Sequence, residues 1–355
     1  MTRLRIIAAL WLAAAASNLA AQAAELADGE PFQAFLQGVR TEALARGVGA
    51  ATLDAVLPTV KLHRRAIESD RSQSEFVDSY ERYLRRVSPR RIERGRALMA
   101  EHGEMIRTVA AAYGVQPRFI VAIIGLESDY GTYPIDEPLF DVLATLAYDD
   151  RRSAQFRGEL FAALEIVEKK YATLDQLKSS WAGGLGVPQF TPSNVLRLAV
   201  DHDQDGRIDL WHVGPDVIAS VANYLRTTGW RDDQTWGREV ALPDGGEDTL
   251  AAPQGDGLTP DAACRTYESL GPWHGLNDWQ ALGVRRVGGA NLPARNLPAA
   301  FIAGDRGDGR GYVVYRNFCS LLRYNPAFRY ALAVGLLADA IAASPARGGT
   351  PRPPA

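Results

Sequence analysis

The apolar residues of the first hundred positions recur at steps of three and four. Over residues 31–102 this spacing places side chains such as Phe32 and Phe35 on one face, and it predicts a series of amphipathic helices. A second stretch, residues 119–126, is apolar on nearly every side, so we expect its helix to be buried, with Pro117 in the first turn. Further helices are expected at residues 156–171, 193–200 and 216–227.

The pattern changes at about residue 239. Up to residue 311 glycine, proline and aspartate become frequent, and short apolar pieces such as residues 239–242 predict strands. Helical spacing returns at residues 330–342. We expect an α+β protein, mainly α, composed of a helical N-terminal lobe (24–110), a second helical segment (111–238), a small inserted strand-rich lobe (239–311), a return to the helical body (312–343) and a disordered tail (344–355).

The N-terminus has the three-part layout of a secretory signal peptide. Two arginines precede an apolar run at residues 6–16, and small residues follow up to Ala23, where we expect cleavage. The run is too short to cross a membrane, which takes roughly 20 apolar residues. Residues 1–23 therefore predict export to the periplasm, with no membrane anchor evident and a monomer as the default state.

Composition and charge narrow the possible functions of the chain. The chain has 355 residues, 46% of them hydrophobic, and a formal net charge of -3, which gives no indication of nucleic-acid binding. Seven arginines crowd residues 82–96, and we interpret them as a solvated helix face, the alternative being a patch that contacts a polyanion. The two cysteines, Cys264 and Cys319, are predicted to form a disulfide in an oxidising compartment, free thiols being the alternative.

Glu127 is the strongest candidate for chemistry. It ends the apolar helix of residues 119–126 and is followed by Gly131, a residue that commonly terminates helices. Partial burial and the negative end of the helix dipole both disfavour a charged carboxylate there, so a raised pKa is expected. A neutral carboxylic acid near pH 7 can protonate a glycosidic oxygen.

Four motifs in the same order resemble the membrane-bound lytic transglycosylase B family of lytic murein transglycosylases. They lie between about residues 30 and 342. The motifs are Gly125-Leu-Glu-Ser-Asp-Tyr-Gly131, Ser180-Trp-Ala-Gly-Gly-Leu-Gly-Val-Pro-Gln-Phe-Thr-Pro-Ser193, Ser220-Val-Ala-Asn-Tyr224, and Tyr315-Arg-Asn-Phe318 with Arg323-Tyr-Asn325 beyond it.

The resemblance implies a fold, a reaction and a set of roles. It implies a lysozyme-like catalytic core at residues 111–238 and Glu127 as general acid and then general base. It further implies that the amino sugars of peptidoglycan glycan strands are held by Ser180, Gln189, Phe190, Tyr224, Tyr324 and Asn325. Amides, hydroxyls and aromatic rings are the groups that sugar recognition requires.

A second carboxylate is the usual requirement of a glycosidase. Asp129 is the nearest one in sequence, but two residues along a continuing helix point about 200° apart, so Asp129 is not expected to face the same bond as Glu127. The family's mechanism avoids this requirement: the substrate's N-acetyl group stabilises the cationic centre, and the muramic 6-hydroxyl replaces water. The implied product is a 1,6-anhydromuramoyl end.

Residues 201–212 follow the spacing of a calcium-binding EF-hand loop over its first nine positions. His212 stands where a bidentate glutamate is usual, and histidine is a poor ligand for a hard cation. The family is similar, closing a longer loop with a later aspartate, which predicts structural Ca²⁺ and no catalytic cofactor. The expected ligands are Asp201, Asp203, Asp205, the Arg207 carbonyl and Asp216. A hydrogen-bonded acidic turn without an ion is the alternative.

Other functions stay open at this point. A hydrolytic muramidase would use the same site with water as acceptor, and a peptidoglycan-binding protein would lack turnover altogether. A calcium sensor is disfavoured because only one such loop is present. Cell-wall synthesis proteins are a further class of partner that the sequence leaves open.

Overall fold

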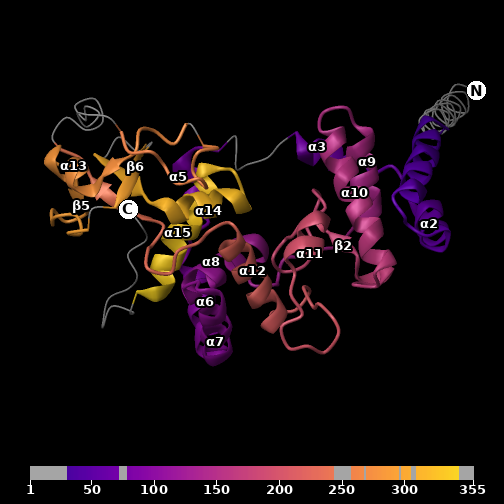
Figure 1. The fold of residues 1–355 in the computed structure, drawn as a ribbon, viewed down its shortest axis with the longest axis horizontal. Coiled ribbons are helices and arrows are strands. Elements are labelled where there is room, and N and C mark those ends of the chain that lie inside the picture. Colours follow the sequence, from indigo (N-terminus) through magenta and orange to yellow (C-terminus); the bar gives the residue numbers. More distant parts are fainter. Residues whose placement is uncertain are drawn as a thin grey trace, which may run out of the picture. The chain divides into compact units, whose positions relative to one another are not determined.

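The computed structural model describes residues 30–71, 78–243, 257–267, 269–295, 297–304 and 309–343 (Figure 1). The predicted signal peptide and C-terminal tail lie outside these residues. The chain forms two compact units, the first built from residues up to 71 with 135–184 and 191–196, and the second from the remainder. Each unit is assembled from several segments that are not contiguous in sequence. The predicted domain boundaries, which follow the chain in order, therefore stay a prediction.

The first unit is helical. Its main pair, α9 and α10, packs side by side, and α2 lies against α10. A short antiparallel pairing of β1 with β2 precedes a glycine-rich turn, where Gly183 has φ +79° and a Cβ would lie 2.5 Å from Leu143. The elements are a helix over residues 30–45, α2 (Ala50–Val56), η1 (Leu57–Thr59), α3 (Arg64–Asp70), β1 (Glu137–Pro138), α9 (Leu139–Tyr148), α10 (Ser153–Glu168), η2 (Leu174–Gln176), β2 (Lys178–Ser179) and α11 (Pro192–Leu198), the last of which crosses into the second unit.

The second unit surrounds a buried central helix, α8, which packs against α6, α7, α12 and above all α15. Local sequence sets the helix ends: Ser88 caps α6 by accepting the Arg91 amide at 3.3 Å, and α7 ends at Gly114 with φ +65°. The helices are α5 (Tyr80–Leu84), α6 (Pro89–Glu101), α7 (Gly103–Tyr113), α8 (Pro117–Ser128), α12 (Pro215–Thr227), α14 (Arg316–Tyr324) and α15 (Phe328–Ala342).

A five-stranded sheet in the order β4-β6-β7-β3-β5 forms the strand-rich lobe of this unit, and each strand pairs antiparallel with its neighbours. Val240, Trp279 and Val313 belong to its buried core. Trp236, fully buried, presses its ring on Gly335 of α15 and donates to Asp339 at 2.9 Å. The elements are β3 (Gly237–Ala241), β4 (His274–Gly275), α13 (Leu276–Ala281), β5 (Arg285–Arg286), β6 (Pro298–Ala303) and β7 (Arg310–Val314).

The fold is mainly helical α+β with a small strand-rich insertion, which confirms the predicted class. The predicted Cys264–Cys319 disulfide is present, and it ties this insertion to α14. Within the described part of the chain no single helix is both long and apolar enough to cross a membrane; α7 and α8 reach that mark only as a pair, bent by 108°.

Candidate active site and cation loop

The end of α8 places Glu127 at the boundary between core and solvent. The eight residues before Glu127 are buried, Glu127 itself is half-buried, and the helix ends one residue later at Ser128. Asp129 and Tyr130 both adopt left-handed backbone conformations, with φ of 47° and 62°. Non-glycine residues with positive φ are uncommon and are held by their surroundings, so this turn is a strongly determined feature of the fold.

Tyr130 supplies part of that determination by inserting between two helices. Its hydroxyl donates to the Arg91 carbonyl at 2.8 Å. A Cβ on Gly95 would lie 2.5 Å from the Tyr130 hydroxyl, and one on Gly125 would lie 2.6 Å from its ring. Each glycine in a helix interior costs about 1 kcal/mol relative to alanine. The Tyr130 side chain occupies the space that side chains at Gly95 and Gly125 would otherwise fill. This packing holds the turn beside Glu127 in place.

Tyr330 on α15 contacts Glu127 directly. Its hydroxyl donates a short hydrogen bond to Glu127 Oε1, at 2.5 Å. Burial, helped by the negative charge of Glu127, raises the pKa of Tyr330 well above its usual range, and the phenol therefore stays a donor throughout the neutral range. The contact fixes one oxygen of the carboxyl group.

An aromatic wall extends from this contact. The ring of Tyr324 stacks on Tyr330 at 6.3 Å and lies 4.6 Å from Tyr224, and Phe190 lies within 6 Å of both Tyr224 and Tyr324. The hydroxyls of the two outer tyrosines donate to backbone carbonyls, Tyr324 to Pro188 at 2.6 Å and Tyr224 to Arg323. Burial raises the pKa of Tyr224 to about 12. Three predicted sugar-binding residues are thus brought together beside Glu127.

The remaining predicted sugar-binding residues occupy turns. Gln189 has φ 51° and donates from Nε2 to the Gly186 carbonyl at 2.8 Å, and Asn325 Oδ1 accepts the Ala327 amide at 3.0 Å. Ser180 belongs to the first unit, where its hydroxyl accepts the Gly184 amide at 3.1 Å. Their roles toward a sugar remain predictions.

Asp129, the alternative second carboxylate, is engaged by arginines. The expectation for Asp129 assumed that the helix continues through this residue, whereas it ends at Ser128. In the structure Asp129 Oδ1 accepts Arg91 Nε at 3.2 Å, and Oδ2 accepts Arg94 Nη1. Arg91 is only 8% exposed. Both oxygens of Asp129 are therefore occupied by ion pairs within the chain.

The arginine-rich stretch is in part structural. Besides Arg91 and Arg94, Arg96 donates to the carbonyls of Ala340 and Ala343 at the end of α15. The interpretation as a solvated helix face is wrong for these three residues. The others include Arg82 and Arg85, which form surface pairs with acidic residues one helical turn away.

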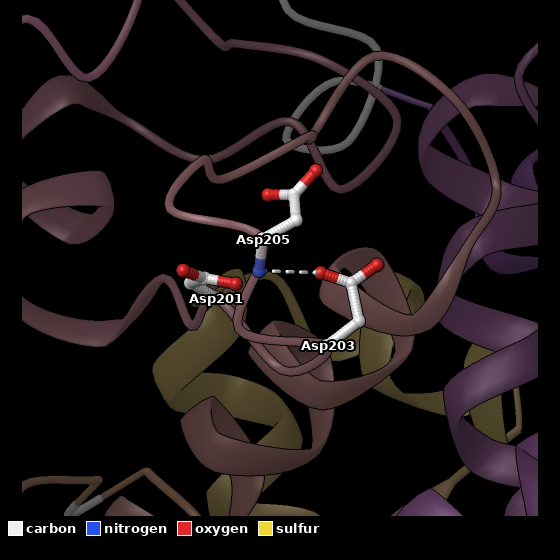
Figure 2. A group of neighbouring side chains, drawn as sticks. All are labelled: Asp201, Asp203 and Asp205. Atoms are coloured by element: carbon white, nitrogen blue, oxygen red, sulfur yellow. Dashed lines mark hydrogen bonds between the residues drawn. The ribbon is translucent and has the colours of Figure 1, made fainter.

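The loop after α11 gathers three carboxylates (Figure 2). One oxygen from each of Asp201, Asp203 and Asp205 lies within 4.8 Å of the others. The carboxylates also brace the loop backbone: Asp203 accepts the Asp205 amide at 3.3 Å, and Asp201 Oδ2 accepts the amide of Gly206, whose φ is 87°. The alternating spacing of the sequence thus produces a tight acidic turn.

The donor set fits a hard cation. Asp201 Oδ1 is buried and lacks a hydrogen-bond partner in the described part of the chain, which leaves a lone pair for an ion. Asp216 is not in this group. Its two oxygens accept the amides of His202 at 2.7 Å and Asp209 at 2.9 Å, so it closes the loop through hydrogen bonds instead. Burial, reinforced by the charges of Asp203 and Asp201, raises the pKa of Asp216.

The acidic loop also supports the turn that carries Gln189. Leu210 accepts the Val187 amide at 2.7 Å through its carbonyl. A Cβ on Gly186 would lie 2.3 Å from that same carbonyl, and Gly186 has φ +64°, so only glycine allows this approach. The conformation of the turn that carries Gln189 therefore depends on the backbone of the acidic loop.

Comparison with protein families shows to which family the chain belongs. The family model described as "Transglycosylase SLT domain" matches residues 31–339. The chain belongs to this family. The resemblance inferred from the four motifs is thereby confirmed.

Relatives in the transglycosylase SLT family support the same assignment. Membrane-bound lytic murein transglycosylase B of Escherichia coli K12 is 32% identical over 258 residues, which cover 72% of this chain; the chain spans 65% of that relative's length. SltB3 from Pseudomonas aeruginosa, solved in complex with NAG-anhNAM-pentapeptide, is 36% identical, with a TM-score of 0.77 over 90% of this chain and 80% of SltB3. E. coli Slt35, solved in complex with calcium, is 26% identical, with a TM-score of 0.69 over 88% of this chain and 93% of Slt35.

Sequence reasoning missed the contacts that hold the transglycosylase motif in place. Tyr330 lies 203 residues along the chain from Glu127, and Arg91 lies 38 residues from Asp129. The four sequence motifs include neither residue and gave no indication of these contacts. Gly95 and Gly125 offered the one available signal, because glycine inside an apolar helix often marks a close approach. These glycines indicate a close contact at both positions, but they do not identify Tyr130 as the contacting residue.

Proposed function

We propose that the chain is a peptidoglycan lytic transglycosylase. It cleaves the β-1,4 bond between N-acetylmuramic acid and N-acetylglucosamine and leaves a 1,6-anhydromuramoyl end. The observation that carries the proposal is the setting of Glu127: a half-buried carboxyl group, fixed at one oxygen by Tyr330 and flanked by an aromatic wall. The engagement of Asp129 by two arginines supports a mechanism that uses a single carboxyl group.

The reaction uses Glu127 twice, for the transfer of two different protons. Glu127 in its neutral form donates a proton to the glycosidic oxygen as the bond from that oxygen to C1 of the muramic residue breaks. The N-acetyl oxygen of the same residue stabilises the positive charge at C1. The 6-hydroxyl oxygen then bonds to C1 and gives its proton to the Glu127 carboxylate, so the acid is regenerated and no water is consumed.

Tyr330 has a positioning role in this scheme. A carboxyl group that must act first as acid and then as base needs one oxygen directed at the bond throughout. The hydrogen bond at Oε1 restrains the orientation of the carboxyl group during both proton transfers. The half-buried ring of Tyr324 offers a face for the apolar side of a sugar, and the buried rings of Phe190 and Tyr224 support it from behind.

The acidic loop is proposed to hold a structural Ca²⁺. Asp201, Asp203 and Asp205, with the Arg207 carbonyl, are the proposed ligands, and Asp216 keeps the loop closed. When bound, the ion would supply charge neutralisation for the three carboxylates and no part of the bond cleavage. The related Slt35 complex with calcium supports this assignment. Action on peptidoglycan places the protein outside the cytoplasm, in line with a signal peptide at residues 1–23.

The test is a digest of purified peptidoglycan sacculi analysed by mass spectrometry. The protein is expected to release anhydromuropeptides, whereas Glu127→Gln, checked for folding by its melting curve, is expected to release about a thousandfold less. Glu101→Gln, an exposed glutamate at the end of α6, is the matched control and should retain activity. Hydrated product ends would instead identify a muramidase, and no release by folded protein would identify a binding protein.

A further inference from the structure

A cavity of about 340 Å³ opens in the strand-rich part of the second unit. Its lining combines apolar and aromatic groups with one arginine. The lining residues used in the argument are Leu258, Cys264, Arg265, Tyr267, Pro272 and Trp273. The Cys264–Cys319 disulfide anchors this lining to α14, the helix whose last residue is Tyr324.

The cavity adjoins the aromatic wall of the active site through Tyr267. The guanidinium group of Arg323 lies 5.8 Å from the Tyr267 ring and donates to Thr266 Oγ1 at 2.9 Å. The backbone carbonyl of Arg323 accepts the Tyr224 hydroxyl, and Tyr324 is the next residue. One residue thus contacts the sugar-binding wall through its backbone and the edge of the cavity through its side chain.

Two positive charges flank Tyr267 and have no acidic partner in the described part of the chain. Arg265 and Arg323 are both exposed, and neither forms an ion pair with a carboxylate among the residues that the structure describes. The acidic residue nearest in sequence to Arg265 with a described structure, Asp261, is paired with Arg231 and Arg316 instead. The rim is therefore suited to an anionic ligand, and arginine binds carboxylates well because two of its N–H groups can donate in parallel.

We propose that this cavity binds the peptide carried by the muramic acid residue of the substrate. A peptide offers what the lining selects: carboxylates for Arg265 and Arg323, and short apolar side chains for Leu258, Pro272 and Trp273. The inference rests on the proposed function, since it requires a peptidoglycan substrate beside Glu127. That SltB3 was solved with a saccharide bearing a pentapeptide shows that such ligands bind a relative of this chain.

The test measures binding without turnover, in the Glu127→Gln background. Affinity is determined by calorimetry for NAG-anhNAM with and without its pentapeptide, and the ratio of the two dissociation constants is the readout. The peptide should tighten binding, and Arg265→Ala or Arg323→Met should each reduce the ratio about tenfold, the usual scale of one hydrogen bond to a charged group. Arg107→Ala, an exposed arginine on α7 outside the cavity, is the control and should leave the ratio unchanged.

A steric variant keeps the test independent of charge. Leu258→Trp fills the cavity from an exposed position, 44% accessible, and should lower the ratio while the affinity for the peptide-free disaccharide stays the same. Unchanged ratios in all three variants would overturn the peptide subsite alone, provided that the unmodified protein still releases anhydro products from peptide-free glycan strands. Failure to bind either saccharide, or to release any product, would overturn the proposed function as well.

Discussion

The turn after α8 and the loop at residues 201–216 both concentrate carboxylates around residues of positive φ, but the partners of those carboxylates differ. At the turn, Asp129 is held by Arg91 and Arg94, and Glu127 accepts a hydrogen bond from Tyr330. At the loop, Asp201, Asp203 and Asp205 converge with no ion pair to an arginine or lysine in the described chain. One acidic cluster is neutralised by the protein's own groups, whereas the other lacks such groups.

The difference separates two ways of preparing a site. Charges neutralised within the chain are in place as soon as it folds, which suits a turn that must present Glu127 in one orientation. Where carboxylates are neutralised by a bound cation, as proposed for Asp201, Asp203 and Asp205, the ordering of the loop depends on that ion. Because the Leu210 carbonyl of the loop accepts the Val187 amide, the turn that carries Gln189 shares this condition, whereas Glu127 does not.

The largest expected effect comes from removing the internal partner of Asp129. Arg91→Met should lower the free energy of unfolding by about 3 kcal/mol, because a mostly buried carboxylate loses one of its two guanidinium partners. Denaturant unfolding measures the loss, with Arg107→Met as the control on an exposed surface. The double variant Arg91→Met/Asp129→Asn should recover part of it, and a strictly additive double variant would refute the pairing.

Calcium removal is expected to have the next largest effect and to act on the other cluster. Saturating calcium should stabilise the protein by about 2–3 kcal/mol over chelator, the linkage expected at a hundredfold excess over the dissociation constant. Melting curves recorded with calcium and with chelator measure this increment. Asp201→Asn should abolish most of the calcium-induced rise in melting temperature, whereas Arg91→Met should retain it in full. A calcium shift that survives in the Asp201→Asn/Asp203→Asn protein would place the ion elsewhere.

The acidic loop was predictable because its determinants are local. Alternating aspartates over five residues and a glycine at the sixth position specify a tight turn without help from the rest of the fold. Asp216 differs, since the family resemblance and not the local spacing made it a predicted ligand, and in the structure its oxygens accept the amides of His202 and Asp209. Two backbone donors in a buried position compete with an ion for the same oxygens, and spacing alone does not reveal them.

The surroundings of Glu127 were predictable only in part. The apolar run before it indicated a buried helix, and motif resemblance brought Phe190, Tyr224 and Tyr324 into one site, where the structure also places them. The contact with Tyr330 depends on the packing of α15 against α8, a tertiary arrangement that periodicity does not specify. Long-range pairs of this kind explain why the arginine stretch was interpreted as a surface.

Tyr330→Phe tests the positioning of the catalytic carboxyl group. Removing the hydroxyl should lower kcat about tenfold and leave KM nearly unchanged, because one hydrogen bond to a charged group is lost without a change in the ring that packs beside Tyr324. Steady-state kinetics on soluble glycan strands measure both constants. A change confined to KM would indicate that Tyr330 binds sugar and does not position Glu127.

A rise of one pH unit in the alkaline range should give the smallest effect for each tyrosine of the aromatic wall. The pKa of Tyr224 is raised to about 12 and that of Tyr324 is raised well above its usual range, mainly by burial. The unfolded chain releases these phenolic protons near pH 10, before the folded protein does. Stability is therefore unaffected below about pH 10 and falls as pH rises toward 12, by at most ~1.4 kcal/mol per pH unit for each tyrosine.

Tyr224→Phe isolates one of these contributions. The variant should show a shallower decline in the free energy of unfolding between pH 10 and 12. Its tyrosinate absorbance should lose one late-titrating group. The calcium increment should stay constant over the same range, because the acidic loop carries no tyrosine. A calcium increment that fell together with stability would mean that the two acidic clusters are coupled through the turn that carries Gln189, by the contact of Leu210 with Val187.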